Sequence, residues 1–130
     1  MTLHPQAQSF VEEVRALDPP GWETMSPEQA RRGFNNFAPL LGDAFPMDSV
    51  RDASSSPVPM RIYKYSEQAS STSPTVVYFH GGGWVLGDLE THDAMCRRIA
   101  SAVCGNVIAV EYGLAPENAF PGPIDDCHTA

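Results

Sequence analysis

Two short runs of β-branched and aromatic residues, separated by a stretch with helical spacing, constrain this fold more than any other feature. The first run spans Thr75–Phe79 and is apolar on both faces, which is typical of a strand buried in a parallel sheet. The second spans Val107–Tyr112, and Met95, Ile99 and Val103 lie between the runs at helical spacing. A strand, a helix and a strand within about forty residues predict a right-handed βαβ unit and a parallel sheet.

Polar residues and a glycine bracket the helix expected between these strands, from about Thr91 to Cys104. Asp88 and Thr91 lie where side-chain oxygens can cap a helix N-terminus. Gly105 follows the last apolar position and is expected to end the helix, because glycine adopts the left-handed conformation common at C-termini.

The first forty residues predict two short amphipathic helices. Ser26, Pro27 and Gln29 form a helix start with a capping residue, a first-turn proline and a capping-box partner. Because such helices cannot form a core alone, the helical segment at residues 1–45 is predicted to cover a core formed by residues 46–130. The apolar positions of the first helix are Leu3, Ala7, Phe10, Val11, Val14 and Leu17, before the stop at Asp18-Pro19-Pro20-Gly21; those of the second are Ala30, Phe34, Phe37 and Leu41.

Residues 47–65 predict a hairpin at the start of this core. Val50, Val58, Met60, Ile62 and Tyr63 are set among turn-forming residues, and Ser54-Ser55-Ser56-Pro57 provides the connection between two short strands.

The charge balance limits the partners of the chain. Its 130 residues include 16 Asp and Glu against 8 Lys and Arg, for a net charge of −8. This sign disfavours nucleic acid and anionic membrane surfaces. Neither a membrane-spanning run nor a secretory leader is recognisable, so a cytoplasmic location is expected. Cys96, Cys104 and Cys127 are accordingly expected to be reduced thiols.

A glycine-rich turn, His80-Gly81-Gly82-Gly83-Trp84, follows the first of the two buried strands. Glycine permits positive φ and removes the Cβ that would block a ligand, and successive amides in such a turn form a hollow that can bind an anion. A glycine triplet alone more often marks a flexible turn that binds nothing. The surrounding motifs decide between these readings.

In these motifs the sequence resembles the hormone-sensitive-lipase-like branch of the α/β-hydrolases, a family of carboxylesterases. The resemblance implies the N-terminal part of an α/β-hydrolase fold, with a mostly parallel sheet, flanking helices and N-terminal cap helices. The matching segments are Val76–Asp88, Thr91-His92-Asp93, Glu111-Tyr112, Leu114-Ala115-Pro116-Glu117, Phe120-Pro121 and Asp125-Asp126.

The resemblance also implies roles for the residues of the glycine turn. Gly82 and Gly83 would donate backbone N–H groups to the oxyanion formed when an ester carbonyl is attacked. Gly81 would serve the turn, and His80 would organise the loop without being the catalytic histidine. Trp84 would pack against the cap or the pocket. The implied substrate is a small-molecule ester, with no cofactor.

The chain departs from the family pattern in its nucleophile. The family's Gly-x-Ser-x-Gly elbow is absent, and Ser101 lies between two alanines inside the predicted helix. Asp125, Asp126 and His128 precede the place where the elbow would occur, so they are interpreted as helix residues. The sequence therefore predicts a truncated ester hydrolase that contributes the oxyanion hole but is inactive alone.

A second departure is Gly113, which stands where the family has arginine. The substitution removes a guanidinium able to make several fixed hydrogen bonds and adds backbone freedom. We therefore expect the loop after the second buried strand to be less stable locally.

Two other functions remain open at this point: a non-catalytic module that binds a small ligand, and an amidase or formamidase. A metal site is not predicted, since His92 and Cys96 are four residues apart and lack the paired spacing of zinc ligands. In the family fold, the strand at residues 75–79 pairs with the strand that carries the elbow. Without that partner its edge is expected to be unpaired and to promote self-association.

Overall fold

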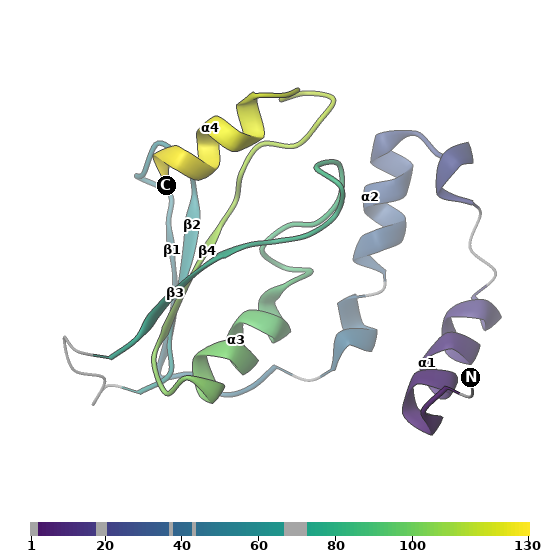
Figure 1. Cartoon of the computed structure of the whole chain (residues 1–130), viewed down its shortest axis with the longest axis horizontal. Coiled ribbons are helices and arrows are strands. Elements are labelled where there is room, and N and C mark those ends of the chain that lie inside the picture. The colour runs from purple at the N-terminus through teal and green to yellow at the C-terminus, as the bar shows by residue number, and fades with distance from the viewer. Residues whose placement is uncertain (1–2, 18–20, 37, 43, 67–72) are drawn as a thin grey trace.

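The computed structural model of the chain describes residues 3–17, 21–36, 38–42, 44–66 and 73–130 (Figure 1). Its helices are α1 (Pro5–Ala16), α2 (Pro27–Asn35), α3 (Asp93–Ala102) and α4 (Gly122–Thr129), with 3-10 turns at Trp22–Thr24 and Ala38–Leu41. Its strands are β1 (Ser49–Ala53), β2 (Met60–Lys64), β3 (Thr75–Phe79) and β4 (Asn106–Val110). None of the described helices is both long enough and apolar enough to cross a membrane.

The four strands form one mixed sheet in the order β1-β2-β4-β3. β1 and β2 are the predicted hairpin, and β2 also pairs antiparallel with β4. β3 and β4 pair in parallel around α3, which confirms the βαβ unit. β4 ends at Val110, so the expected strand at Val107–Tyr112 is two residues too long, and Tyr112 is free to contact the turn after β3.

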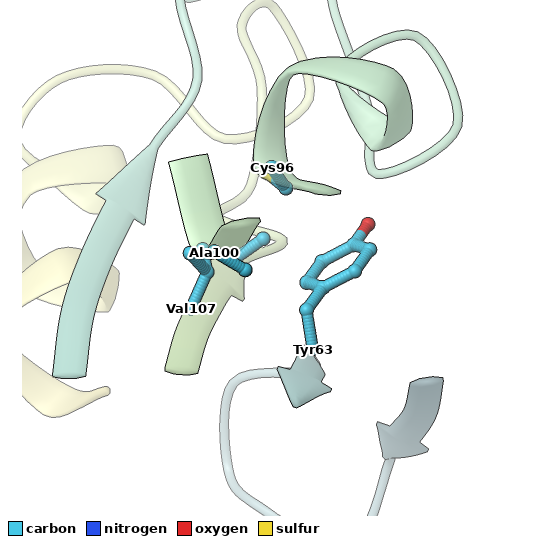
Figure 2. Packing of buried hydrophobic residues seen from close by; sticks show 5 residues of the cluster. Tyr63, Cys96, Ala100 and Val107 are labelled. Atoms are coloured by element: carbon cyan, nitrogen blue, oxygen red, sulfur yellow. The ribbon is translucent and has the colours of Figure 1, made fainter. Parts of the chain in front are cut away.

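The core lies between this sheet and α3 (Figure 2). Tyr63, Cys96, Ala100 and Val107 are fully buried there. The helical spacing placed Met95 on the apolar face of this helix, but that side chain is 51% exposed. The buried stripe runs instead through Cys96 and Ala100, four residues apart, since positions at this spacing share one helix face.

Both ends of α3 differ in detail from the sequence prediction. His92 is the N-cap residue and makes no side-chain capping bond, whereas Asp88 and Thr91 bond each other in the preceding turn. At the C-terminus the left-handed residue is Cys104, with φ 48°, and Gly105 donates its N–H to Ala100 O at 3.0 Å. Gly105 is required for space, because a Cβ there would overlap the Pro74 carbonyl oxygen.

The N-terminal helices lie to one side of the sheet, and α2 is close to the loop after β3 (Figure 1). The capping box of α2 is confirmed: Gln29 N donates to Ser26 Oγ at 3.3 Å, and Ser26 N donates to Gln29 Oε1 at 2.8 Å. α2 ends at Asn35, so the apolar stripe predicted as far as Leu41 is interrupted, and Phe37 lies outside the described residues, as does the expected stop at 18–20. α1 buries none of its side chains.

β3 is covered on one face only. Val76 and Tyr78 pack against the core under α3, but Val77 and Phe79 on the opposite face are 51% and 44% exposed. The expectation that this strand is buried on both faces is therefore wrong for the described structure. On that opposite face, the buried cluster of Val58, Val110 and Tyr112 packs with Cys127 of α4, and this cluster stops short of β3.

The free edge of β3 leads to a prediction about association, for which we propose a second copy of the chain as the partner. Among the described strands β3 lies at the edge of the sheet, and unpaired backbone groups beside exposed Val77 and Phe79 favour pairing between strands of two copies. We expect size-exclusion chromatography with light scattering to show oligomers that decrease in Val77→Lys, because a charge on an edge strand opposes pairing. Leu17→Lys, at a similarly exposed apolar position of the N-terminal region, is the control. A monodisperse wild-type monomer would contradict the prediction.

Candidate functional site

The site is built on the turn that leaves β3 at His80 and ends at Gly87. Gly82, Gly83, Trp84 and Gly87 all have positive φ, at 130°, 61°, 60° and 92°. Glycine adopts these values without the steric cost that other residues meet. A Cβ at Gly82 would also overlap the carbonyl oxygen of Leu86, whose N–H closes the turn on Gly82 O at 2.9 Å. The glycine pattern is thus dictated by the backbone path.

Three consecutive amides of this turn are free to bind a ligand. Among the described residues, no hydrogen bond is donated by the backbone N–H of Gly82, Gly83 or Trp84. The turn borders a hollow of about 270 Å³ with Phe79, His80, Tyr112 and Cys127. Unpaired amide donors around such a hollow can receive an anion or a developing negative charge.

A second hollow adjoins the first through Gly83 and Trp84. It has a volume of about 430 Å³ and is otherwise lined by Ala115, Phe120, Pro123 and Ile124. Trp84, predicted to pack against the cap or the pocket, borders both hollows and is 61% exposed. The arrangement places polar donors next to an apolar wall, a combination suited to a ligand with one polar and one apolar end.

His80 and Tyr112 form the base of the turn. The Tyr112 hydroxyl donates to His80 O at 2.5 Å, and the two rings stack with centroids 4.4 Å apart. His80 Nδ1 lies 2.8 Å from Gly81 O, and the residue is 5% exposed. These contacts fix the ring and the carbonyl group of His80 at the start of the turn. Sequence reasoning did not assign Tyr112 this part, although its position directly after β4 is the relevant signal.

His92 lies behind His80, with ring centroids 5.2 Å apart. Its Nδ1 is 3.1 Å from Thr91 Oγ1, and its ring also packs near Tyr78 and Phe34. Burial lowers the pKa of His92, and the neighbouring His80 lowers it further. His92 is therefore a packing residue that favours the neutral imidazole.

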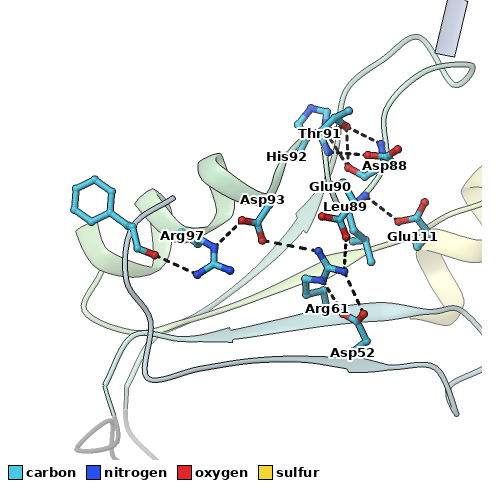
Figure 3. Close-up of polar contacts among 11 residues, drawn as sticks. Asp52, Arg61, Asp88, Leu89, Glu90, Thr91, His92, Asp93, Arg97 and Glu111 are labelled. Atoms are coloured by element: carbon cyan, nitrogen blue, oxygen red, sulfur yellow. Dashed lines mark hydrogen bonds and ion pairs between the residues drawn. The ribbon is translucent and has the colours of Figure 1, made fainter. Parts of the chain in front are cut away.

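A charged network fixes the segment that runs from the turn into α3 (Figure 3). Arg61 of β2 bonds Asp52 at 2.6 Å and Glu90 at 2.7 Å, and lies 3.8 Å from Asp93. The hydrogen bond to Asp52, followed in size by that to Glu90, raises the pKa of Arg61. Because its side chain is only 14% exposed, the network joins the hairpin firmly to residues 90–93. Sequence analysis gave no indication of this network, since Arg61 and its partners lie in three separate segments of the chain.

Glu111 holds the same segment from the end of β4. Its Oε2 accepts from Leu89 N at 2.9 Å (Figure 3). Burial raises the pKa of Glu111, although the bond from Leu89 opposes this shift. The residues that follow both parallel strands are thus connected at the carboxyl edge of the sheet, where ligands bind in open α/β folds.

The three candidate residues near the C-terminus lie in a helix, α4, as predicted. Asp125, Asp126 and His128 all fall within its bounds. Asp126 Oδ2 accepts from Gly113 N at 2.8 Å and from Asn118 Nδ2 at 2.9 Å, so it orders the loop after β4. Ser101 lies inside α3, away from the turn.

The remaining candidates do not form a second site. Cys96, Cys104 and Cys127 are free thiols, and Cys96 is buried in the core. Within the described ranges, no group of three or more His, Cys, Asp or Glu side chains is arranged to hold a metal ion.

Comparison with known proteins defines the class. A family model described as the α/β hydrolase fold matches residues 76–130. Esterase LipI of Mycobacterium tuberculosis is 42% identical over 87 residues, which are 65% of this chain and 27% of that protein.

Solved structures agree with this class over the whole chain. An ester hydrolase from the metagenome of Lake Arreo superimposes with a TM-score of 0.87 and 32% identity, covering 98% of this chain and 43% of that one. An esterase of the bacterial hormone-sensitive lipase family gives 0.82 and 25% identity, covering 100% and 42%.

The fold is that of the α/β-hydrolases. Within that class, the chain belongs to the hormone-sensitive-lipase-like family and forms the N-terminal portion of its fold. It spans less than half the length of these relatives.

The geometry of the turn predicts that adjacent glycines differ in their tolerance of a side chain. Gly82→Ala should lower the free energy of unfolding by about 2 kcal/mol or more, because its Cβ overlaps Leu86 O at a positive φ. Gly81→Ala is the control, since no atom lies within 4 Å of its added Cβ, and should change stability by about 0.5 kcal/mol or less. Urea denaturation of both variants tests this; equal losses would contradict it.

The burial of His92 predicts a pH dependence of stability. Because its pKa is lowered in the folded state, the unfolded chain binds the proton more readily below about pH 6.5, and stability falls as the medium is acidified. Glu111, with a raised pKa, contributes in the opposite direction. We expect His92→Gln to reduce the stability lost between about pH 7.5 and 5.5. His128→Gln, on the exposed end of α4, is the control, and an unchanged slope in His92→Gln would contradict the assignment.

Proposed function

We propose that this chain supplies the oxyanion-binding turn of a carboxylic-ester hydrolase. The observation that carries the proposal is the pair of backbone N–H groups of Gly82 and Gly83, which donate to no other described residue and lie at the carboxyl end of a parallel strand. Donors fixed in this way stabilise the negative oxygen of a tetrahedral intermediate without reorienting. The names of the esterases that this chain resembles support the same reaction.

The two adjoining hollows support an ester with a short or medium acyl group as the substrate. The carbonyl oxygen would lie against the amides of Gly82 and Gly83, in the hollow of about 270 Å³. An apolar portion of the ester would enter the neighbouring hollow between Trp84 and Phe120. The unpaired thiols are compatible with a cytoplasmic location, which is part of the proposal.

The 130 residues contain no serine elbow that could supply the nucleophile. No serine of the sequence has glycines at both flanking positions of an elbow, and Ser101 lies within α3. We therefore expect the 130-residue chain to hydrolyse an activated short-chain ester no faster than a denatured control. Turnover that persists on purification and is stopped by a serine-directed inhibitor would contradict this.

A chimera tests the role of the turn. Residues 1–130 would replace the matching part of the Lake Arreo ester hydrolase, to which the chain superimposes with a TM-score of 0.87. A plain Gly83→Pro change removes the N–H but also forces φ to about −65°, against the 61° of Gly83. The D-amino acids avoid this conflict, because their preferred φ is positive. Ligation at Cys96 allows D-proline or D-alanine to be placed at position 83.

The two variants differ in a single hydrogen-bond donor. We expect D-alanine at position 83 to retain activity and D-proline to lower kcat by about 10²–10³, the usual effect of losing one oxyanion donor. Circular dichroism and thermal unfolding check that both chimeras fold alike. If the D-proline chimera keeps the kcat of the D-alanine chimera, Gly83 does not bind the oxyanion.

A further inference from the structure

The side chain of Arg31 reaches from α2 to the loop that carries the candidate donors. Its Nε donates to Val85 O at 2.8 Å, and its Nη2 donates to Ala115 O at 2.8 Å. Nη1 and Nη2 form a two-point pair with Glu117, at 3.0 and 2.7 Å. One guanidinium thus joins three segments that are distant in sequence.

The carbonyl groups bound by Arg31 belong to the glycine turn and to the loop that supports it. Ala115 N donates to Trp84 O at 2.7 Å, so two consecutive turn carbonyls, those of Trp84 and Val85, are held. Val85 N and Leu86 N in turn donate to Gly82 O, at 3.2 and 2.9 Å. The path from Arg31 to the amides of Gly82 and Gly83 is therefore short and made of hydrogen bonds.

The turn needs such external contacts. Trp84 has φ 60° without being glycine, a conformation that persists only where the surroundings impose it. Its side chain is largely exposed and provides little packing, so backbone bonds hold the turn. The bonds to the carbonyls matter more than the ion pair, because Glu117 is 57% exposed and exposed pairs contribute little.

We propose that Arg31 is a positioning residue for the glycine turn: through Val85 O and Ala115 O, it fixes the amides of Gly82 and Gly83 from the cap helix α2. The catalytic consequence rests on the proposed function, whereas the hold on the turn does not. The planar fork of arginine suits this role, since lysine presents one ammonium and cannot reach both carbonyls and Glu117 in the same geometry.

Hydrogen exchange on the 130-residue chain tests the hold directly. In Arg31→Gln and Arg31→Lys, the amides of Val85 and Leu86 should exchange about tenfold faster or more, because their turn opens more often. The amides of β4 should be unchanged. Arg32→Gln is the matched control: it removes the adjacent exposed guanidinium from the same helix and should leave the turn unaffected. Unchanged exchange at Val85 and Leu86 in Arg31→Lys, or equal acceleration throughout the sheet, would overturn the proposal.

The chimera tests the catalytic consequence. Arg31→Lys should lower kcat about tenfold with KM within about twofold, because the donors act mainly on the transition state. A purely structural role would reduce the active fraction without altering kcat per folded molecule. If the chimera with D-proline at position 83 retains full kcat while the Arg31 variants still accelerate amide exchange at Val85 and Leu86, the proposed function fails and the hold of Arg31 on the turn stands. If D-proline at position 83 abolishes activity but the Arg31 variants leave amide exchange at Val85 and Leu86 unchanged, the proposed function stands and the hold of Arg31 on the turn fails.

Discussion

The site depends on the parallel pairing of β3 with β4, because this pairing brings the residues after both strands to one edge of the sheet. His80 follows β3 and Tyr112 follows β4, and their stacked rings and the hydroxyl bond to His80 O join the two strand ends. Glu111 adds a bond to Leu89 N on the far side of the turn. These contacts close the base of the glycine turn independently of the contact that Arg31 of α2 makes with it.

The elements around this pair could be predicted because their signals are local. Proline at the first turn and the Ser26–Gln29 capping box set the start of α2, and the bounds of β3 coincide with a run of β-branched and aromatic residues. The turn could be identified because glycine is needed where φ is positive and space is limited, as at Gly82. Local preference and backbone geometry agree in these segments.

The features that escaped prediction involve contacts between distant segments. Burial of β3 on both faces was expected from its composition, yet composition does not tell which neighbours cover a strand, and Val77 and Phe79 are exposed. Met95 was predicted to lie on the buried face of α3, but it is exposed, because packing against β2 and β4 decides which face of the helix is buried. Nothing in the local sequence distinguishes Arg61 and Arg31 from other arginines. Only the fold brings their carboxylate and carbonyl partners within reach.

Position 113 shows how such contacts offset a local loss. The resemblance implies arginine here, and glycine alone would leave the loop after β4 free to move. In the structure, Gly113 N bonds Asp126 of α4, and Asn118 bonds the same carboxylate oxygen. The hollow of about 490 Å³ beside Gly113 is also lined by Arg31, whose guanidinium bonds Ala115 O in that loop. The loop is therefore held by the guanidinium of Arg31 in α2, in place of one at position 113. Since the same group binds Val85 O, the ordering of the loop and that of the glycine turn are linked through one side chain.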